Sequence, residues 1–172
     1  MTNISTALET SLKSDSSEAN IRKWVGYIID HNIALHTLHA VLDAERTVSM
    51  RFTWLIGGLC EQAPEIVSPS VAYFYSKRHE VVFANYDRSL AKMFWLAGVP
   101  PEIEGEAIDD MFRWLLDANI TVSTKTYSMS ALHNLTAKYP ELKNELKICV
   151  EDQLGKNTAN FDKRLKKVLE SL

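Results

Sequence analysis

Three residues of the sequence have a spacing that suits metal binding. His36 and His39 are one helical turn apart, and Asp43 follows His39 by four positions. One helix face could therefore offer two imidazoles and a carboxylate, groups that bind Zn²⁺. His31 would lie about 140° around the helix from His36, so this stretch supplies no third histidine, and the spacing lacks a named metal-binding signature. We interpret these residues as surface histidines, and we expect no metal ion and no cofactor.

A group of carboxylates stands at the start of another predicted helix. Paired carboxylates can perform general acid–base catalysis, but no histidine or nucleophile converges with these in the sequence. Carboxylates are favoured in the first turn of a helix by its dipole, so we interpret the group as a solvated helix start. We also expect Asp109 and Arg113 to pair at i, i+4. The group consists of Glu102, Glu104, Glu106, Asp109 and Asp110.

Large aromatic residues are numerous for a small helical protein. They could stack on nucleotide bases or grip a peptide. Several fall on apolar helix faces, so we expect them to pack mainly in the core, with at least one of Tyr73 and Tyr75 exposed because both flank Phe74. These residues are Trp24, Trp54, Trp95, Trp114, Tyr73, Phe74 and Tyr75. The pair Gly57-Gly58 lies inside a predicted helix, where it would permit close contact with a neighbouring helix.

The remaining sequence contains no recognisable catalytic motif. A glycine-rich phosphate loop, a Gly-x-Ser-x-Gly elbow and a Cys-x-x-Cys pair are all missing. Cys60 and Cys149 are 89 positions apart among apolar neighbours, which predicts two free, buried thiols in a reducing compartment. The sequence therefore assigns no catalytic, metal-binding or partner-binding residue.

The overall composition is that of a soluble globular protein. The chain has 172 residues, of which 46% are hydrophobic and 24% charged, and its formal net charge is −3. These values exclude a disordered or collagen-like chain. The longest stretches without a formal charge have 12 residues, fewer than the roughly 20 that a membrane-spanning helix needs. No secretory signal opens the sequence, so we expect a cytoplasmic protein without membrane contact.

The spacing of apolar residues is helical along almost the whole chain. Ile21, Val25 and Ile28 illustrate the i, i+4, i+7 pattern of one helix face, and no run alternates as a strand does. We therefore predict an all-α fold of nine or ten helices joined by short connections. Their expected ranges are 3–13, 17–30, 32–45, 48–62, 65–83, 87–97, 101–118, 124–138, 140–154 and 158–171.

Residues with capping preferences mark the ends of these helices. Side chains that accept hydrogen bonds are expected as N-caps, and glycines are expected just beyond helix ends. The predicted N-caps are Ser16 or Ser17, Asp87, and Ser123 or Thr124, and the predicted C-terminal glycines are Gly98 and Gly155.

An internal repeat is the strongest feature of the sequence. An apolar residue, four further residues and then Pro-Glu-Ile or Pro-Glu-Leu occur at 59–66, 96–103 and 135–142, in steps of 37 and 39 residues. Ile56, Met93 and Leu132 precede the three anchors by one helical turn. Apolar residues also recur eight positions after each copy, at Phe74, Met111 and Val150. Each unit therefore predicts a helix, a turn closed by proline and a second helix.

A two-helix repeat of this length resembles the HEAT and armadillo-like α-solenoids. The resemblance covers roughly residues 48–171 and is greatest in 128–154, although the Asp and Arg or Lys residues common in HEAT repeats are not regular here. It implies a right-handed α–α superhelix, since stacked repeats together bury a core that one repeat cannot. We expect one domain, 1–172, with N-terminal helices (1–46), three helical hairpins (47–154) and a C-terminal capping helix (155–172).

A fold-level resemblance restricts function only loosely. Repeats without a catalytic constellation favour a non-enzymatic scaffold that binds a protein or peptide partner. The alternative is a nucleic-acid-binding or DNA-repair protein, because bacterial alkylpurine DNA glycosylases use a HEAT-like fold. Those enzymes hold DNA in a basic groove, whereas this chain has a net charge of −3 and its densest basic cluster, at 163–167, lies on the last helix. A small-molecule lyase or hydrolase ranks third.

Overall fold

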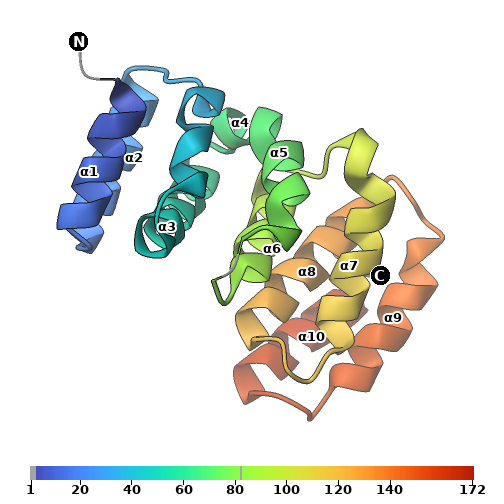
Figure 1. Cartoon of the computed structure of the whole chain (residues 1–172). Coiled ribbons are helices and arrows are strands. Elements are labelled where there is room, and N and C mark those ends of the chain that lie inside the picture. Colours follow the sequence, from blue (N-terminus) through green and yellow to red (C-terminus); the bar gives the residue numbers. More distant parts are fainter. Residues whose placement is uncertain (1–2, 82) are drawn as a thin grey trace.

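The protein is built from helices (Figure 1), which confirms the predicted fold class. The computed structural model describes residues 3–81 and 83–172; Met1, Thr2 and Val82, which fall in the predicted segment 1–46 and helix 65–83, lie outside the described residues. No strand occurs in the described part of the chain. The α-helices are α1 (Ile4–Ser14), α2 (Glu18–Asp30), α3 (Arg46–Gln62), α4 (Pro64–Val67), α5 (Val71–Ser76), α6 (Tyr86–Leu96), α7 (Glu104–Leu116), α8 (Val122–Leu135), α9 (Leu142–Gln153) and α10 (Ala159–Ser171). The 3₁₀ helices are η1 (Leu35–Asp43), η2 (Ser68–Ser70), η3 (Lys77–His79) and η4 (Pro101–Ile103).

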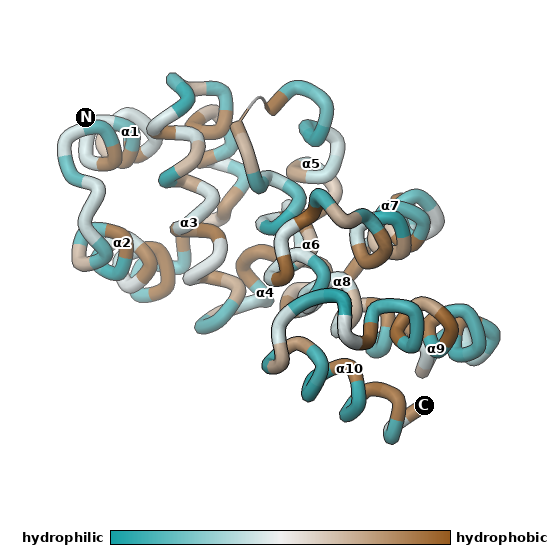
Figure 2. Tube along the Cα trace, turned by 90° about the horizontal axis from the view of Figure 1, so that it is seen from below, coloured by the Kyte–Doolittle hydropathy of each residue, from teal (hydrophilic) through white to brown (hydrophobic). Residues whose placement is uncertain are grey.

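The helices form two curved layers. In one layer α2 packs on α3, α3 on α6, α6 on α8 and α8 on α10, while the other contains α1, η1, α4 to η3, α7 and α9. Successive helices alternate between the layers, as expected for stacked helical hairpins. Figure 2 shows the α2–α3–α6–α8–α10 layer on the inner side of the bend and α1, α5, α7 and α9 on the outer side. We call these the inner and outer layers.

The sequence repeat corresponds to three of these hairpins. The helix pairs are α3 with α4–α5, α6 with α7, and α8 with α9. Pro64 begins α4, Pro101 begins η4 and Pro140 lies two residues before α9, where the missing N–H of proline leaves no hydrogen bond unmade. Ile56, Met93 and Leu132 are all buried. One continuous apolar core links residues from α1 to α10.

Two predicted helices differ from the structure. The segment predicted as 32–45 is the 3₁₀ helix η1, in which Leu35, Leu38 and Val41 are buried at intervals of three residues. That interval matches the three residues per turn of a 3₁₀ helix. The segment predicted as 65–83 is divided into α4, η2, α5 and η3. Pro69 lies at this break. The helix is interrupted there because proline cannot donate the hydrogen bond that a continuous helix requires.

The helix caps are partly as predicted. Ser17 caps α2, and Gly98 and Gly155 have positive φ angles beyond the ends of α6 and α9, which confirms three predictions. Two predicted N-caps are wrong. The N-cap of α8 is Thr121, which accepts a hydrogen bond from the N–H of Thr124. The N-cap of α6 is Asn85 with φ 71°, a left-handed conformation that asparagine tolerates, so Asp87 falls in the first turn. None of the described helices has the length and apolar character to cross a membrane.

Candidate partner-binding groove

Trp54 is the most exposed tryptophan of the protein. Its neighbours in α3, Thr53 and Leu55, are buried, whereas the Trp54 side chain remains 48% exposed. The prediction that the aromatic residues pack mainly in the core therefore holds for Trp114, Phe74 and Tyr75 and fails for Trp54. Trp24, Trp95 and Tyr73 are half-buried. The prediction that at least one of Tyr73 and Tyr75 is exposed is wrong, because Tyr73 is half-buried and Tyr75 is buried.

A hollow of about 460 Å³ lies beside Trp54 between α3 and α6. Trp54 and Gly57 contribute to its α3 side, and Arg88, Ser89 and Lys92 line its α6 side. A second hollow of about 400 Å³ lies between α2 and α3, and Trp54 and Lys92 border it too. The two hollows therefore adjoin along the inner layer, and we call them together the inner groove.

The paired glycines of α3 explain how the groove is shaped. A Cβ atom at Gly58 would lie 3.0 Å from Cγ2 of Val25 in α2, and one at Gly57 would lie 3.5 Å from Nζ of Lys92 in α6. The absence of side chains thus allows α2 to approach α3 closely and lets Lys92 lie next to α3. This confirms the predicted role of Gly57-Gly58 in close packing.

The charges of the inner groove are unevenly distributed. The residues that line the α3–α6 hollow include Arg88 and Lys92 and no carboxylate within the described chain. Nζ of Lys92 lies 2.6 Å from Oε1 of Glu61, and Glu61 lines the α2–α3 hollow together with Glu18 and Arg22. Positive charge therefore prevails near α6, whereas each carboxylate of the α2–α3 hollow is balanced by a cation, Glu18 by Arg22 and Glu61 by Lys92.

Arg88 is the cation of the groove that carries no ion pair within residues 3–81 and 83–172. Its side chain is exposed in the first turn of α6. Burial raises the pKa of the preceding residue, Asp87. Arg113 lowers this pKa and Asp110 raises it, and the pKa lies above its usual value. A guanidinium group without a carboxylate partner can receive an anionic ligand.

The residues considered for metal binding instead join two segments of the outer layer. Nε2 of His39 lies 2.9 Å from Oγ of Ser70, and the His39 ring stacks on Tyr73 with centroids 3.7 Å apart. Burial lowers the pKa of His39, and the nearby His36 lowers it further. Asp43 pairs with Lys77 at 3.4 Å. The described residues contain no group of three histidine, cysteine or acidic side chains arranged to hold a metal ion.

The carboxylates near the start of α7 do not form one solvated group. Glu102 and Asp109 are exposed, as predicted, and so is Glu106, which pairs with Arg78 at 2.7 Å. Glu104 is buried, contrary to the prediction. Its position three, four and seven residues before Ala107, Ile108 and Met111 places it on the apolar face of α7, a signal that was available in the sequence.

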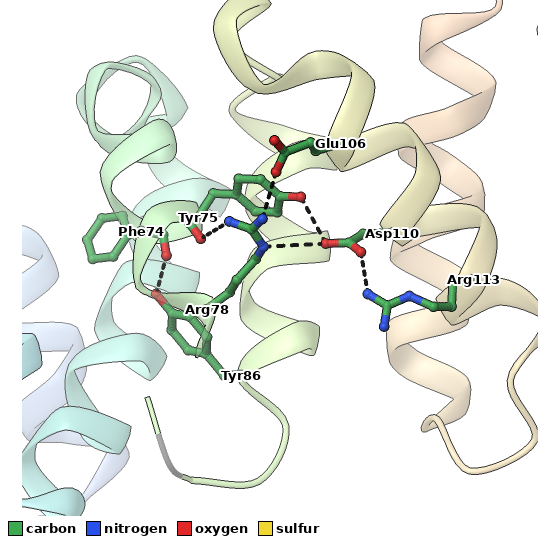
Figure 3. A network of polar contacts seen from close by, with 7 residues as sticks. All are labelled: Phe74, Tyr75, Arg78, Tyr86, Glu106, Asp110 and Arg113. Atoms are coloured by element: carbon green, nitrogen blue, oxygen red, sulfur yellow. Dashed lines mark hydrogen bonds and ion pairs between the residues drawn. The ribbon is translucent and has the colours of Figure 1, made fainter. Parts of the chain in front are cut away.

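Asp110 is the second carboxylate that departs from the prediction. Its Oδ2 accepts a hydrogen bond of 2.9 Å from the hydroxyl of Tyr75 and lies 3.7 Å from Nε of Arg78 (Figure 3). Arg113 pairs with Asp110 and not with Asp109, which corrects the predicted i, i+4 pair. Burial and the neighbouring Asp110 raise the pKa of Tyr75. These contacts join α5 and η3 to α7 in the outer layer.

The two cysteines are free and buried, as predicted. Burial raises the pKa of the Cys60 thiol to about 12, and burial also raises the pKa of Cys149. Because the thiolate is the nucleophilic form, both side chains are unreactive at neutral pH and act as core residues.

The inner groove was not predicted from the sequence, although α3 contains a signal for it. Met50 precedes Trp54 by four positions, but Gly57 and Gly58 follow it by three and four positions. Residues at this spacing share a helix face, so the C-terminal side of Trp54 has no bulky neighbour on its own helix. A large aromatic residue beside two glycines indicates a surface that is open to a ligand or another helix.

Comparison with known proteins agrees with the fold. The family model of the HEAT repeat domain matches residues 8–159, which include α2 to α9 and most of α1. Neither curated proteins nor solved structures give a significant match to the chain. The match extends over the three hairpins and the N-terminal helices, beyond the region in which the sequence repeat is visible. The chain belongs to the HEAT repeat domain family.

Proposed function

We propose that the protein is a cytoplasmic, non-enzymatic scaffold that binds a segment of a protein partner in the inner groove. The observation that carries this proposal is the position of Trp54, which is 48% exposed and borders both hollows of the groove. Tryptophan is enriched among the residues that dominate binding energy at protein interfaces. A partner that covers Trp54 would bury apolar surface that the protein alone leaves in water.

The groove also has the rigidity that a binding site requires. Trp54 and the charged lining residues lie on α2, α3 and α6, helices of 13, 17 and 11 residues, and α3 packs on both α2 and α6. Ser16, before α2, and Phe83, Ala84 and Asn85, before α6, complete the lining. Side chains held on packed helices are positioned more exactly than side chains on loops. A peptide segment could therefore bind without a large rearrangement of the protein.

A nucleic-acid ligand is the second candidate, because Arg88 lies near an exposed aromatic ring in the α3–α6 hollow. Bases stack on aromatic side chains, and phosphates attract arginine. However, Lys92 is paired with Glu61, and the adjoining hollow presents Glu18 as well. Arg22 is paired with Glu18, which leaves Arg88 as the groove's cation without an ion pair in the described chain. One such cation offers little attraction to a phosphate backbone, so the protein partner is the better-supported candidate.

Site-specific photo-crosslinking tests the proposed function. A photoreactive benzoylphenylalanine is introduced at Ser89, which lines the groove, or at Lys147, which is exposed on α9 of the outer layer. We expect a defined protein to be crosslinked in the native cell from position 89 and not from position 147. Trp54→Ala should abolish that crosslink.

Three outcomes of this experiment would contradict the proposal. The first is the absence of a protein crosslink specific to position 89, and the second is a crosslink that persists in full with Trp54→Ala. The third is crosslinking of position 89 to DNA or RNA, which would favour the nucleic-acid candidate. Circular dichroism of each variant checks that the helical fold is retained.

A further inference from the structure

We infer that the partner segment is a peptide in which an apolar residue is flanked by acidic residues on one side and by neutral residues on the other. This inference rests on the proposed function, because it specifies what the inner groove binds. The charge distribution of the groove supports it. The α3–α6 hollow carries Arg88 and Lys92 without a lining carboxylate in the described chain, in a protein whose net charge is −3.

The α3–α6 hollow is suited to a carboxylate. Arg88 and Lys92 are four residues apart in α6, so their side chains share one face of the helix. The guanidinium group of Arg88 is exposed and can hold a carboxylate through two parallel hydrogen bonds. Lys92 is fixed by Glu61 at 2.6 Å, and its side chain is only 16% exposed. An acidic residue of the peptide therefore pairs first with Arg88, while Lys92 adds positive charge at the border of the two hollows.

The centre of the groove is suited to an apolar side chain. Trp54 borders both hollows, and Gly57 and Gly58 lie one turn further along the same face of α3. An apolar residue of the peptide can therefore lie against the indole ring without meeting bulky side chains at these two positions. Burial of aromatic surface is a large source of binding energy, which makes this contact the anchor.

The α2–α3 hollow has no net charge among its lining residues. Besides Lys92, which it shares with the other hollow, its charged lining residues are Glu18, Arg22 and Glu61. Arg22 pairs with Glu18 and Lys92 pairs with Glu61, so neither sign of charge is in excess. A peptide that places acidic residues near Arg88 in α6 and neutral residues near α2 matches the groove, and the reverse orientation leaves Arg88 without a carboxylate partner. Such an arrangement favours one direction of binding.

Selection from a random peptide library tests this inference without assuming a sequence. Twelve-residue peptides displayed on phage are selected on the full chain, and those that also bind the Trp54→Ala variant are removed. The recovered peptides are then synthesised with a fluorescent label, and their Kd values are measured by fluorescence anisotropy. We expect them to have acidic residues on one side of an aromatic or aliphatic residue and neutral residues on the other.

Charge reversal provides the decisive comparison. Arg88→Glu should raise the Kd of these peptides at least tenfold, and lysines in place of the acidic residues of the peptide should restore binding to this variant. Lys147→Glu makes the same change of charge at an exposed position of the outer layer and should leave the Kd unchanged. Because Arg88 is exposed, Arg88→Glu should unfold at the same temperature as the wild-type protein.

The possible results separate the failure of this inference from the failure of the proposed function. Peptides that require Trp54 but lack acidic residues, or bind Arg88→Glu as tightly as the wild-type protein, overturn the charge preference and leave the scaffold function intact. If no peptide depends on Trp54, both proposals are overturned. Both proposals are also overturned if the binding of a 20-nucleotide single-stranded DNA depends on Trp54 and Arg88 while the binding of the peptides does not.

Discussion

Glu104 at the start of α7 lies 2.7 Å from Nζ of Lys138, which follows the end of α8 by three residues. The hydroxyl of Tyr139 donates a second hydrogen bond to the same carboxylate at 2.5 Å. Burial alone would raise the pKa of Glu104, but the hydrogen bonds from Lys138 and Tyr139 and the charge of Lys138 hold it below its usual value. The ionised carboxylate thus joins the second and third hairpins of the sequence repeat.

Replacing this carboxylate with an amide is expected to destabilise the protein. Glu104 is 7% exposed, and Glu104→Gln removes charge-assisted hydrogen bonds that contribute about 1–3 kcal/mol. Because the pKa of Glu104 is lower in the folded protein, this stabilisation is present above the unfolded pKa of 4.5 and is lost as the pH falls through the folded value. Urea denaturation should therefore show a difference between variant and wild type at pH 7 that narrows at pH 3.

Glu102 provides the matched control for this experiment. It lies two residues earlier and is exposed, so Glu102→Gln should change the free energy of unfolding by less than about 0.5 kcal/mol. Equal effects of the two substitutions would show that Glu104 does not stabilise the junction.

Asp110 should stabilise the contact between α5 and α7. Its side chain is 16% exposed and accepts the Tyr75 hydroxyl while pairing with Arg78 and Arg113. Asp110→Asn removes the charge from these contacts, and we expect it to reduce the free energy of unfolding by about 1–2 kcal/mol, since Arg113 is largely exposed. Thermal unfolding followed by circular dichroism measures the loss.

Asp109→Asn is the control that distinguishes the observed ion pair from the one predicted by spacing. Asp109 is exposed, and Arg113 pairs with Asp110. Asp109→Asn should therefore leave the unfolding temperature almost unchanged. A larger loss in this variant than in Asp110→Asn would contradict the arrangement in Figure 3.

Lys125 in α8 is buried, and no carboxylate of the described residues forms an ion pair with its ammonium group. It is 2% exposed, and Nζ donates a hydrogen bond of 2.8 Å to Oε1 of Gln153. Burial lowers its pKa. Because the desolvation of a charge opposes folding, Lys125→Met should leave the stability unchanged or raise it by up to about 2 kcal/mol at pH 7.

The pH dependence of Lys125→Met provides a second check. The pKa of Lys125 is lower in the folded protein than the unfolded value of 10.5, so the folded state loses its proton first as the pH rises. The free energy of unfolding of the wild-type protein therefore increases as the pH rises from the folded to the unfolded pKa of Lys125. The stability advantage of Lys125→Met should consequently be smaller at pH 10 than at pH 7. Lys147→Met, at an exposed position, should show no such change. An advantage that grows toward pH 10 would contradict the burial of a charged Lys125.

The hairpins could be predicted from the sequence because their signals are local. Pro64, Pro101 and Pro140 mark the turns between helices, and apolar residues at helical spacing mark the buried faces. The 3₁₀ conformation of η1 is also a local property, since Leu35, Leu38 and Val41 are three residues apart. The prediction failed there because that spacing also satisfies part of an α-helical pattern.

The groove and the buried carboxylate depend on contacts between distant segments. Glu104 pairs with a residue 34 positions away, and no local pattern indicates that partner. Likewise, the exposure of Trp54 depends on how α2 and α6 pack beside α3, and the hollows on its two sides involve residues from 16 to 92. The sequence provided the face on which Glu104 lies, but the arrangement of neighbouring hairpins determined what that face contacts.

Gly57 and Gly58 allow the packing of α3 to be tested on each of its sides. Alanine is favoured over glycine inside a helix by about 0.5–1 kcal/mol. A Cβ at Gly57 would lie 3.5 Å from Nζ of Lys92, an ordinary contact with a flexible side chain. Gly57→Ala should therefore stabilise the protein by nearly the full amount, measured by urea denaturation.

Gly58→Ala should lack this gain, because its Cβ would lie 3.0 Å from Cγ2 of Val25. Val25 is 1% exposed, and a buried side chain has little room to move in a close-packed core. We expect Gly58→Ala to be less stable than Gly57→Ala by about 1 kcal/mol or more. Combining Gly58→Ala with Val25→Ala removes the close contact, so the double variant should be more stable than the sum of the single effects predicts. Additive effects, or equal stabilisation by the two glycine substitutions, would show that α2 does not pack against α3 at Gly58.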